Sequence, residues 1–129
     1  MRLKRKRLIR QLFNRNRSDV HSVVAGGVRI LYRVVAGNKV GVDIPIKVGF
    51  AVGRRTGNAV SRNRLKRIMR EVYRAHQEGL IDLFSRRDDV LTIMIVVRGD
   101  PNEARKRMAR DLPVALARLT ERLRAPSHP

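Results

Sequence analysis

The feature that most constrains the fold is a nearly unbroken apolar run late in the chain, VLTIMIVV at residues 90–97. Only Thr92 interrupts it, and the run is far shorter than the roughly 20 residues needed to span a bilayer. Continuous runs of branched apolar residues are typical of strands that are covered on both faces of a sheet. We therefore expect residues 90–97 to form a strand buried on both faces.

Two earlier segments also have the pattern of strands. Residues 28–35 (VRILYRVV) are rich in β-branched side chains, and residues 46–52 (IKVGFAV) alternate with period two. The turn-forming residues 36–38 follow the first of these strands, so we expect the two strands to pair as a hairpin. Residues 20–25 (VHSVVA) are a candidate for one more short strand.

Helical periodicity marks residues 59–77 and 102–124, and the apolar residues of 8–13 recur at helical spacing in a short N-terminal helix that we expect to stop near residues 14–16. Pro113 interrupts the segment 102–124 and should kink the helix or restart it. The predicted order is α-β-β-β-α-β-α when the short strand is counted, which makes the chain an α+β protein with helices packed on a mixed sheet. A length of 129 residues fits one domain. We place that domain at residues 1–124 and expect 125–129 to be a disordered tail.

The charge of the chain is strongly unbalanced, with 30 Lys and Arg against 11 Asp and Glu and a net charge of +19. Residues 1–17 and 54–74 carry eight basic side chains each, and Glu71 is the single acidic residue in either segment. Such an excess calls for a polyanionic partner, with nucleic acid the first candidate and a membrane surface the second. The chain has no cysteine, and its first seven residues lack the apolar stretch of a secretory signal. We expect a soluble, cytoplasmic polyanion-binding protein.

The segment 59–77 places its charges on one side of the predicted helix. At about 100° per residue, Leu65, Ile68, Met69, Val72 and His76 share an apolar arc, and six polar residues occupy the opposite arc. These six are Arg62, Asn63, Lys66, Arg67, Arg70 and Arg74, with Arg64 at the border. Cations without interleaved acids repel one another, so an anionic partner is expected on this face. Asn58 or Ser61 is expected to cap the helix.

A catalytic grouping is not evident in the sequence. The three histidines are far apart, and His76 falls on the apolar arc of its helix. Asp88 and Asp89 are the only adjacent carboxylates, and neighbours entering a strand point to opposite faces. A metal-dependent nuclease needs several carboxylates that converge on one or two ions. We therefore predict no catalytic residue and no metal ligand in this chain.

The segment 49–71, GFAVGRRTGNAVSRNRLKRIMRE, resembles the signature of the bacterial ribonuclease P protein family. The likeness lies in a strand, a loop with two cations, a Gly-Asn-Ala-Val turn and an Arg-Asn-Arg helix. Weaker likeness covers residues 2–13, 30–32 and 89–98. The resemblance implies a single compact domain of the ribosomal-S5-domain-2-like type with a left-handed βαβ crossover. Without the resemblance we would expect the common right-handed crossover, so the left-handed one rests on the family alone.

The resemblance also implies a function. In this family the RNA subunit catalyses Mg²⁺-dependent removal of the 5′ leader from precursor tRNA, and the protein binds that RNA, in a 1:1 complex, and the leader. We carry the family's RNA-binding positions over to this sequence and add the other residues of the cationic arc. The expected RNA-binding residues are then Arg54, Arg55, Asn58, Arg62, Asn63, Arg64, Lys66, Arg67, Arg70 and Arg74. The leader cleft would contain Ile9, Phe13 and Tyr32. Ile9 stands where the family has an aromatic residue, and Phe13 and Tyr32 could equally be core residues.

Three other functions fit the charge and size of the chain. A structural ribosomal protein is the main alternative, because it also combines a small domain with a large excess of cations. A DNA-binding regulator would need a helix-turn-helix, which the sequence does not show clearly. A role at a membrane surface is the weakest of the three, because the basic helices lack an aromatic face for lipid. The Mg²⁺ ion is expected to be held mainly by the RNA.

Overall fold

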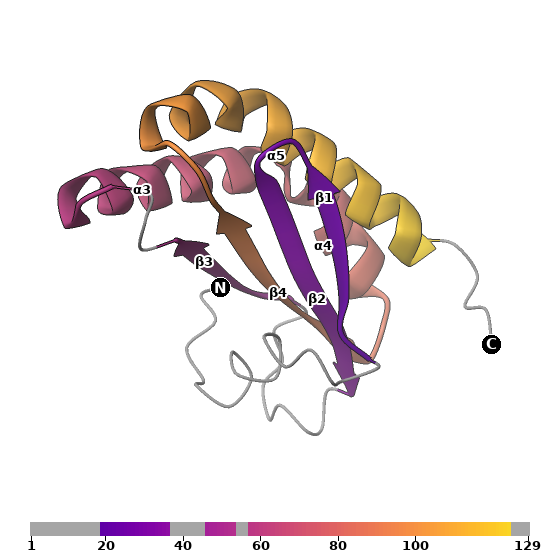
Figure 1. Cartoon of the computed structure of the whole chain (residues 1–129). Helices are drawn as coiled ribbons and strands as arrows, with labels where there is room; N and C mark the ends of the chain where they lie inside the picture. The colour runs from indigo at the N-terminus through magenta and orange to yellow at the C-terminus, as the bar shows by residue number, and fades with distance from the viewer. Residues whose placement is uncertain (1–18, 37–45, 54–56, 125–129) are drawn as a thin grey trace.

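A computed structural model of the chain describes residues 19–36, 46–53 and 57–124. Within these ranges the elements are β1 (His21–Ala25), β2 (Val28–Ala36), β3 (Ile46–Val52), α3 (Ala59–His76), α4 (Glu78–Ser85), β4 (Asp89–Val97) and α5 (Pro101–Arg124). Figure 1 shows the strands as one sheet with the helices gathered along one side. The predicted N-terminal helix and the predicted tail at 125–129 lie outside the described residues.

The sheet has the strand order β1-β2-β4-β3, so β4 occupies an inner position. Its Ile95 lies opposite Ile30 of the antiparallel strand β2 and opposite Phe50 of the parallel strand β3. The predicted hairpin between residues 28–35 and 46–52 is therefore wrong, because β4 lies between these two strands. The apolar run explains the difference: it is buried best with a strand on either side. The predicted strand at 20–25 is confirmed as β1, which pairs with β2.

Both faces of β4 are covered, as the apolar run predicts. Every residue from Val90 to Val97 is buried. On one face, Ile93 and Ile95 join a core that includes Met108 and Leu112 of α5. On the other face, Met94 belongs to a second, smaller cluster with Val35, Val90 and Val96. Since α3 and α5 pack on the first face, this face anchors the helix that carries the cations.

The helices agree only in part with the sequence pattern. Helix α3 lies where residues 59–77 predict it, but α4 has no counterpart among the predicted elements. This helix of eight residues buries Leu80 and Phe84, and it is too short to show a clear period. Helix α5 continues through Pro113 without restarting, and its predicted apolar side, including Leu112, Leu116 and Leu119, is buried.

Two arginines of α5 serve the fold directly. The Arg118 guanidinium donates a hydrogen bond to the carbonyl oxygen of Val24, and that of Arg122 donates one to Ser22, each at 2.7 Å. Both carbonyls belong to β1, the edge strand of the sheet. Exposed edge strands can pair with other chains, and a covering helix prevents such pairing. A large positive charge therefore does not make every cation of this chain available to a partner.

Candidate nucleic-acid interface

The first turn of α3 is fixed by a cap and a close contact. Asn58 Oδ1 accepts a hydrogen bond from the backbone N–H of Ser61 at 2.9 Å. Of the two residues expected as the helix cap, Asn58 and Ser61, the cap is therefore Asn58. Gly57 has φ of +107°, and a Cβ there would lie 3.0 Å from Cγ of Pro101 at the start of α5. No acidic side chain occupies the first turn of α3. The first turn of α3 therefore supplies no carboxylate to offset the positive end of the helix dipole.

The polar side chains of α3 fall into two rows. Asn63, Arg64, Arg67 and Arg74 are exposed, and these residues point away from the core. A second row, Arg62, Lys66 and Arg70, is half-buried. Long cationic side chains commonly pack their aliphatic stems on apolar surface and leave the charged end outside. Residues of the exposed row can therefore be substituted with little effect on packing, whereas the side chains of the half-buried row also pack against the protein.

Tyr73 explains why the cationic arc is not wholly exposed. On a helical wheel it falls about 20° from Arg62, inside the predicted polar arc. In the structure it is buried with Leu65 and Met69, and its ring meets Phe50 of β3 edge to face at 5.9 Å between centroids. His76, predicted on the apolar arc, is instead exposed, and its Nδ1 lies 2.9 Å from the Val72 carbonyl oxygen. The buried face of α3 is thus rotated toward the cations.

The burial of Tyr73 makes a pH-dependent prediction. Burial raises the pKa of Tyr73 from 10.0 to about 12. Between these values the unfolded chain loses the phenolic proton and the folded chain keeps it, so stability falls as pH rises from about 10 to about 12. The expected loss is about 2 to 3 kcal/mol in the free energy of unfolding. Urea unfolding at a series of pH values should show this loss in the wild type and not in Tyr73→Phe, and equal losses in both proteins would contradict it.

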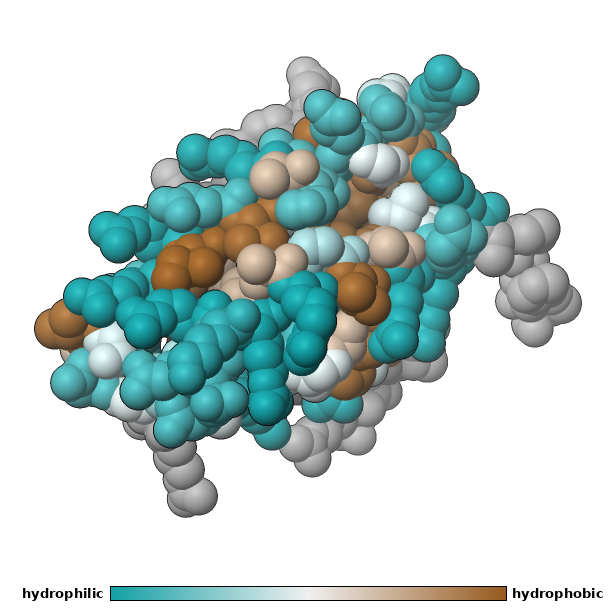
Figure 2. Space-filling model, turned by 90° about the horizontal axis from the view of Figure 1, so that it is seen from above, coloured by the Kyte–Doolittle hydropathy of each residue, from teal (hydrophilic) through white to brown (hydrophobic). Residues whose placement is uncertain are grey.

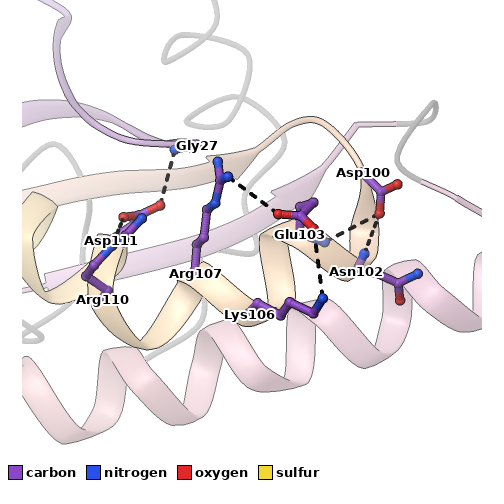
Figure 3. A network of polar contacts seen from close by, with 8 residues as sticks. All are labelled: Gly27, Asp100, Asn102, Glu103, Lys106, Arg107, Arg110 and Asp111. Atoms are coloured by element: carbon purple, nitrogen blue, oxygen red, sulfur yellow. Dashed lines mark hydrogen bonds and ion pairs between the residues drawn. The ribbon is translucent and has the colours of Figure 1, made fainter.

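Several cations elsewhere in the described structure pair with carboxylates, whereas those of α3 do not. On α5, Glu103 pairs with Lys106 and Arg107, and Asp111 pairs with Arg110, as Figure 3 shows. Within the described part of the chain, none of the six Lys and Arg side chains of α3 forms an ion pair. Figure 2, which looks down on α3 and α5, shows hydrophilic side chains over most of this face. The face is therefore positively charged without internal compensation.

The half-buried row also holds unsatisfied donors. The Nε atoms of Arg62 and Arg70 are buried, and neither has a hydrogen-bond partner within the described residues. Buried donors are normally paired, and an unpaired one costs free energy. The two residues lie two helical turns apart along one row of α3, with Lys66 between them. Their two Nε atoms therefore have no oxygen acceptor within the described structure, and oxygens of anionic groups are the acceptors that guanidinium groups bind best.

The remaining predicted site residues have other locations. Arg54 and Arg55 precede α3, and Ile9 and Phe13 belong to the N-terminal segment; all four lie outside the described residues. Tyr32 lies on β2 with 6% of its surface exposed, packed in the core with its ring 5.5 Å from that of His21. A stacking contact with a base would require this ring to leave the core. Asn58 is exposed, but its side chain already serves as the helix cap.

Two other kinds of site were also considered among the described residues. No group of three or more His, Asp or Glu side chains among them could hold a metal ion. No helix in the described ranges combines the length and the hydropathy that a bilayer-spanning segment requires. A clustered, uncompensated cationic face on α3 is therefore the strongest candidate site in the part of the chain that the structure covers.

Comparison with protein families gives one match across most of the chain. Residues 1–120 match the model of the Ribonuclease P family. The chain is 34% identical to the ribonuclease P protein component of a Nocardioides species over 98 residues, which cover 74% of this chain and 75% of that protein. It is 51% identical to the protein component of Natranaerobius thermophilus over 35 residues, and this match spans only 30% of the relative's length.

Solved structures show the same fold. The RNase P protein of Staphylococcus aureus superposes with a TM-score of 0.63 and 19% identity, covering 92% of this chain and 94% of that one. The RNase P protein of Thermotoga maritima gives a TM-score of 0.60 and 22% identity, covering 97% and 99%. These likenesses confirm the predicted α+β class with a mixed four-stranded sheet and a single domain. The handedness of the β3-to-β4 crossover stays a prediction.

Proposed function

This chain belongs to the ribonuclease P protein family, and on that premise we propose that it is the protein subunit of a ribonuclease P. It binds the catalytic RNA and the 5′ leader of precursor tRNA, and it assists the endonucleolytic cut that produces the mature 5′ end. The observation that carries this proposal is the cationic face of α3, whose six Lys and Arg side chains have no carboxylate partner in the described structure.

The contribution of the protein is electrostatic. RNA carries one negative charge per phosphate, and cations that neutralise phosphates release counterions and strengthen binding. Arginine suits this task because its planar fork donates two parallel hydrogen bonds to phosphate oxygens. In the proposed complex, the exposed Arg64, Arg67 and Arg74 contact the backbone directly. Phosphate oxygens near Arg62 and Arg70 would supply acceptors for guanidinium groups whose Nε atoms have none among the described residues.

The reaction itself is assigned to the RNA. In this proposal the RNA subunit holds the Mg²⁺ ion, and among the described residues no group of three or more His, Asp or Glu side chains could hold one. In this proposal one protein binds one RNA in the cytoplasm, and no protein side chain touches the scissile phosphate as a base or nucleophile.

Reconstitution tests the proposal. Purified protein alone should leave precursor tRNA intact, and the protein mixed with the family's RNA subunit should restore cleavage at a Mg²⁺ concentration too low for the RNA alone. The measurement is the rate of appearance of mature 5′ ends. Cleavage by RNA-free protein would overturn the assignment of the chemistry. Failure to stimulate the RNA, together with co-sedimentation with ribosomal particles, would favour a structural ribosomal protein.

A further inference from the structure

Helix α3 carries a single lysine among its cations. Lys66 lies in the half-buried row between Arg62 and Arg70, one helical turn from each. Its side chain forms no ion pair within the described residues. A lysine amine can be acylated and so lose its charge, whereas an arginine guanidinium stays charged. Lys66 is therefore the position at which acylation can remove a charge from α3.

Arg62 and Arg70 can hold an anion beside Lys66. Their Nε atoms are buried without an acceptor in the described structure, and guanidinium groups form strong hydrogen bonds to phosphate oxygens. Glu71, the single carboxylate of α3, falls about 140° from Lys66 around the helix, so it does not oppose an anion on this row. A small molecule that carries a phosphate is therefore attracted to the row that would also bind an RNA phosphate.

The other two lysines of the described structure have different surroundings. Lys47 on β3 is only 5% exposed, so reagents in solution do not reach its amine. Lys106 on α5 is exposed, and its Nζ lies 3.9 Å from Oε1 of Glu103, which also pairs with Arg107 (Figure 3). A carboxylate at this distance repels an anionic reagent. Lys106 is therefore an internal control for Lys66.

We propose that Lys66 is a site of acylation by an acyl phosphate, and that this reaction competes with RNA for α3. The phosphate of the reagent binds between Arg62 and Arg70, and the unprotonated Lys66 amine attacks the acyl carbon. An N–C bond forms, the C–O bond to the phosphate breaks, and the amine proton leaves with the phosphate as hydrogen phosphate. An uncharged amide remains. The proposal rests on the proposed function, because the charge that is lost is one that would bind the RNA.

The first test compares an anionic with a neutral acetylating reagent. The folded protein is treated with acetyl phosphate or with the N-hydroxysuccinimide ester of acetic acid, and peptide mass spectrometry follows acetylation at Lys66 and Lys106. The ratio of the Lys66 rate to the Lys106 rate should be at least about fivefold higher with acetyl phosphate, because the cationic row concentrates only the anionic reagent. An equal ratio with the two reagents would overturn the proposal.

Two double variants identify the cations that recruit the reagent. Arg62→Gln/Arg70→Gln should abolish most of the preference of acetyl phosphate for Lys66. Arg86→Gln/Arg124→Gln removes two exposed charges outside α3 and should keep the preference within about twofold of the wild type. Should the first variant fail to fold, the wild type at about 1 M salt, where the Debye length is about 3 Å, replaces it and should also lose the preference. A preference that survives would contradict recruitment by these arginines.

The second test measures the competition with RNA. An excess of the RNA subunit should slow acetylation at Lys66 at least about fivefold by mass action and leave Lys106 within about twofold of its rate. Lys66→Gln, which resembles the uncharged amide, should make the slope of log affinity against log salt shallower by about 0.7 to 0.9. Lys106→Gln should keep the slope of the wild type. Equal protection of the two lysines by RNA would contradict the competition.

The two proposals fail in different ways. If substitutions on α3 weaken RNA binding but acetyl phosphate shows no preference for Lys66, the acylation site is wrong and the proposed function stands. If Lys66 is acetylated preferentially but RNA gives no protection and substitutions on α3 leave RNA binding unchanged, the reactive lysine stands and the proposed function is wrong.

Discussion

Neutralising Arg64, Arg67 and Arg74 together should weaken binding to the RNA subunit by roughly a hundredfold to a thousandfold without disturbing the fold. The three side chains are exposed on α3 and have no carboxylate partner within the described residues. A hydrogen bond between an arginine and a phosphate is worth about tenfold in affinity or more, and the three contacts do not add exactly. The check is the dissociation constant of the Arg→Gln triple variant at fixed salt, with the melting temperature measured alongside.

The control for this variant removes the same number of charges elsewhere. Arg86, Lys106 and Arg124 are exposed, and none of them lies on α3. Their triple replacement by Gln should change RNA affinity by no more than a fewfold. If both triple variants lose affinity equally, total charge and not the geometry of α3 governs binding, and the cationic face has no special role.

Replacing Phe84 with Ala should lower the free energy of unfolding by about 3 to 5 kcal/mol, the largest stability effect expected here. Phe84 is fully buried and is among the largest enclosed side chains of the core. Its removal leaves a cavity that the surrounding sheet and α5 cannot fill. The measurement is urea unfolding followed by circular dichroism.

A second substitution on the same helix separates burial from helix propensity. Ile81 is 37% exposed on α4, and Ile81→Ala should cost less than about 1 kcal/mol. Losses of similar size at positions 81 and 84 would show that α4 is not packed as the structure describes.

Much of the fold follows from local patterns. The apolar run at 90–97 predicts a strand buried on both faces because no polar face is available to meet water. The helical period of residues 59–77 predicts α3 almost to the residue, because the helix spans five turns and the pattern repeats often enough to be unambiguous. Asn58 could be foreseen as a cap from its short polar side chain just before the helix.

What the sequence could not predict depends on contacts between distant segments. The position of β4 between β2 and β3 overrides the local preference for a hairpin, since pairing on two sides protects more of the apolar run. Tyr73 is buried because Phe50 and the sheet lie beneath it, and this contact rotates the helix and half-buries Arg62 and Arg70. A helical wheel contains no information about such a partner.

The same limit applies to the candidate site. The sequence locates the cations of α3, but it does not reveal that Arg118 and Arg122 bind backbone carbonyls of β1 and so serve the fold. Tyr32, expected either in the leader cleft or in the core, packs in the core, because alternation on β2 points it toward the helices.

The salt dependence of binding to the RNA subunit tests the central claim most directly. If Arg64, Arg67 and Arg74 contact phosphates, the slope of log affinity against log salt should become shallower by about 2.1 to 2.7 in the triple variant, or about 0.7 to 0.9 for each contact. The control triple variant should keep the slope of the wild type. A slope unchanged by the loss of these three cations would show that α3 does not bind the RNA backbone.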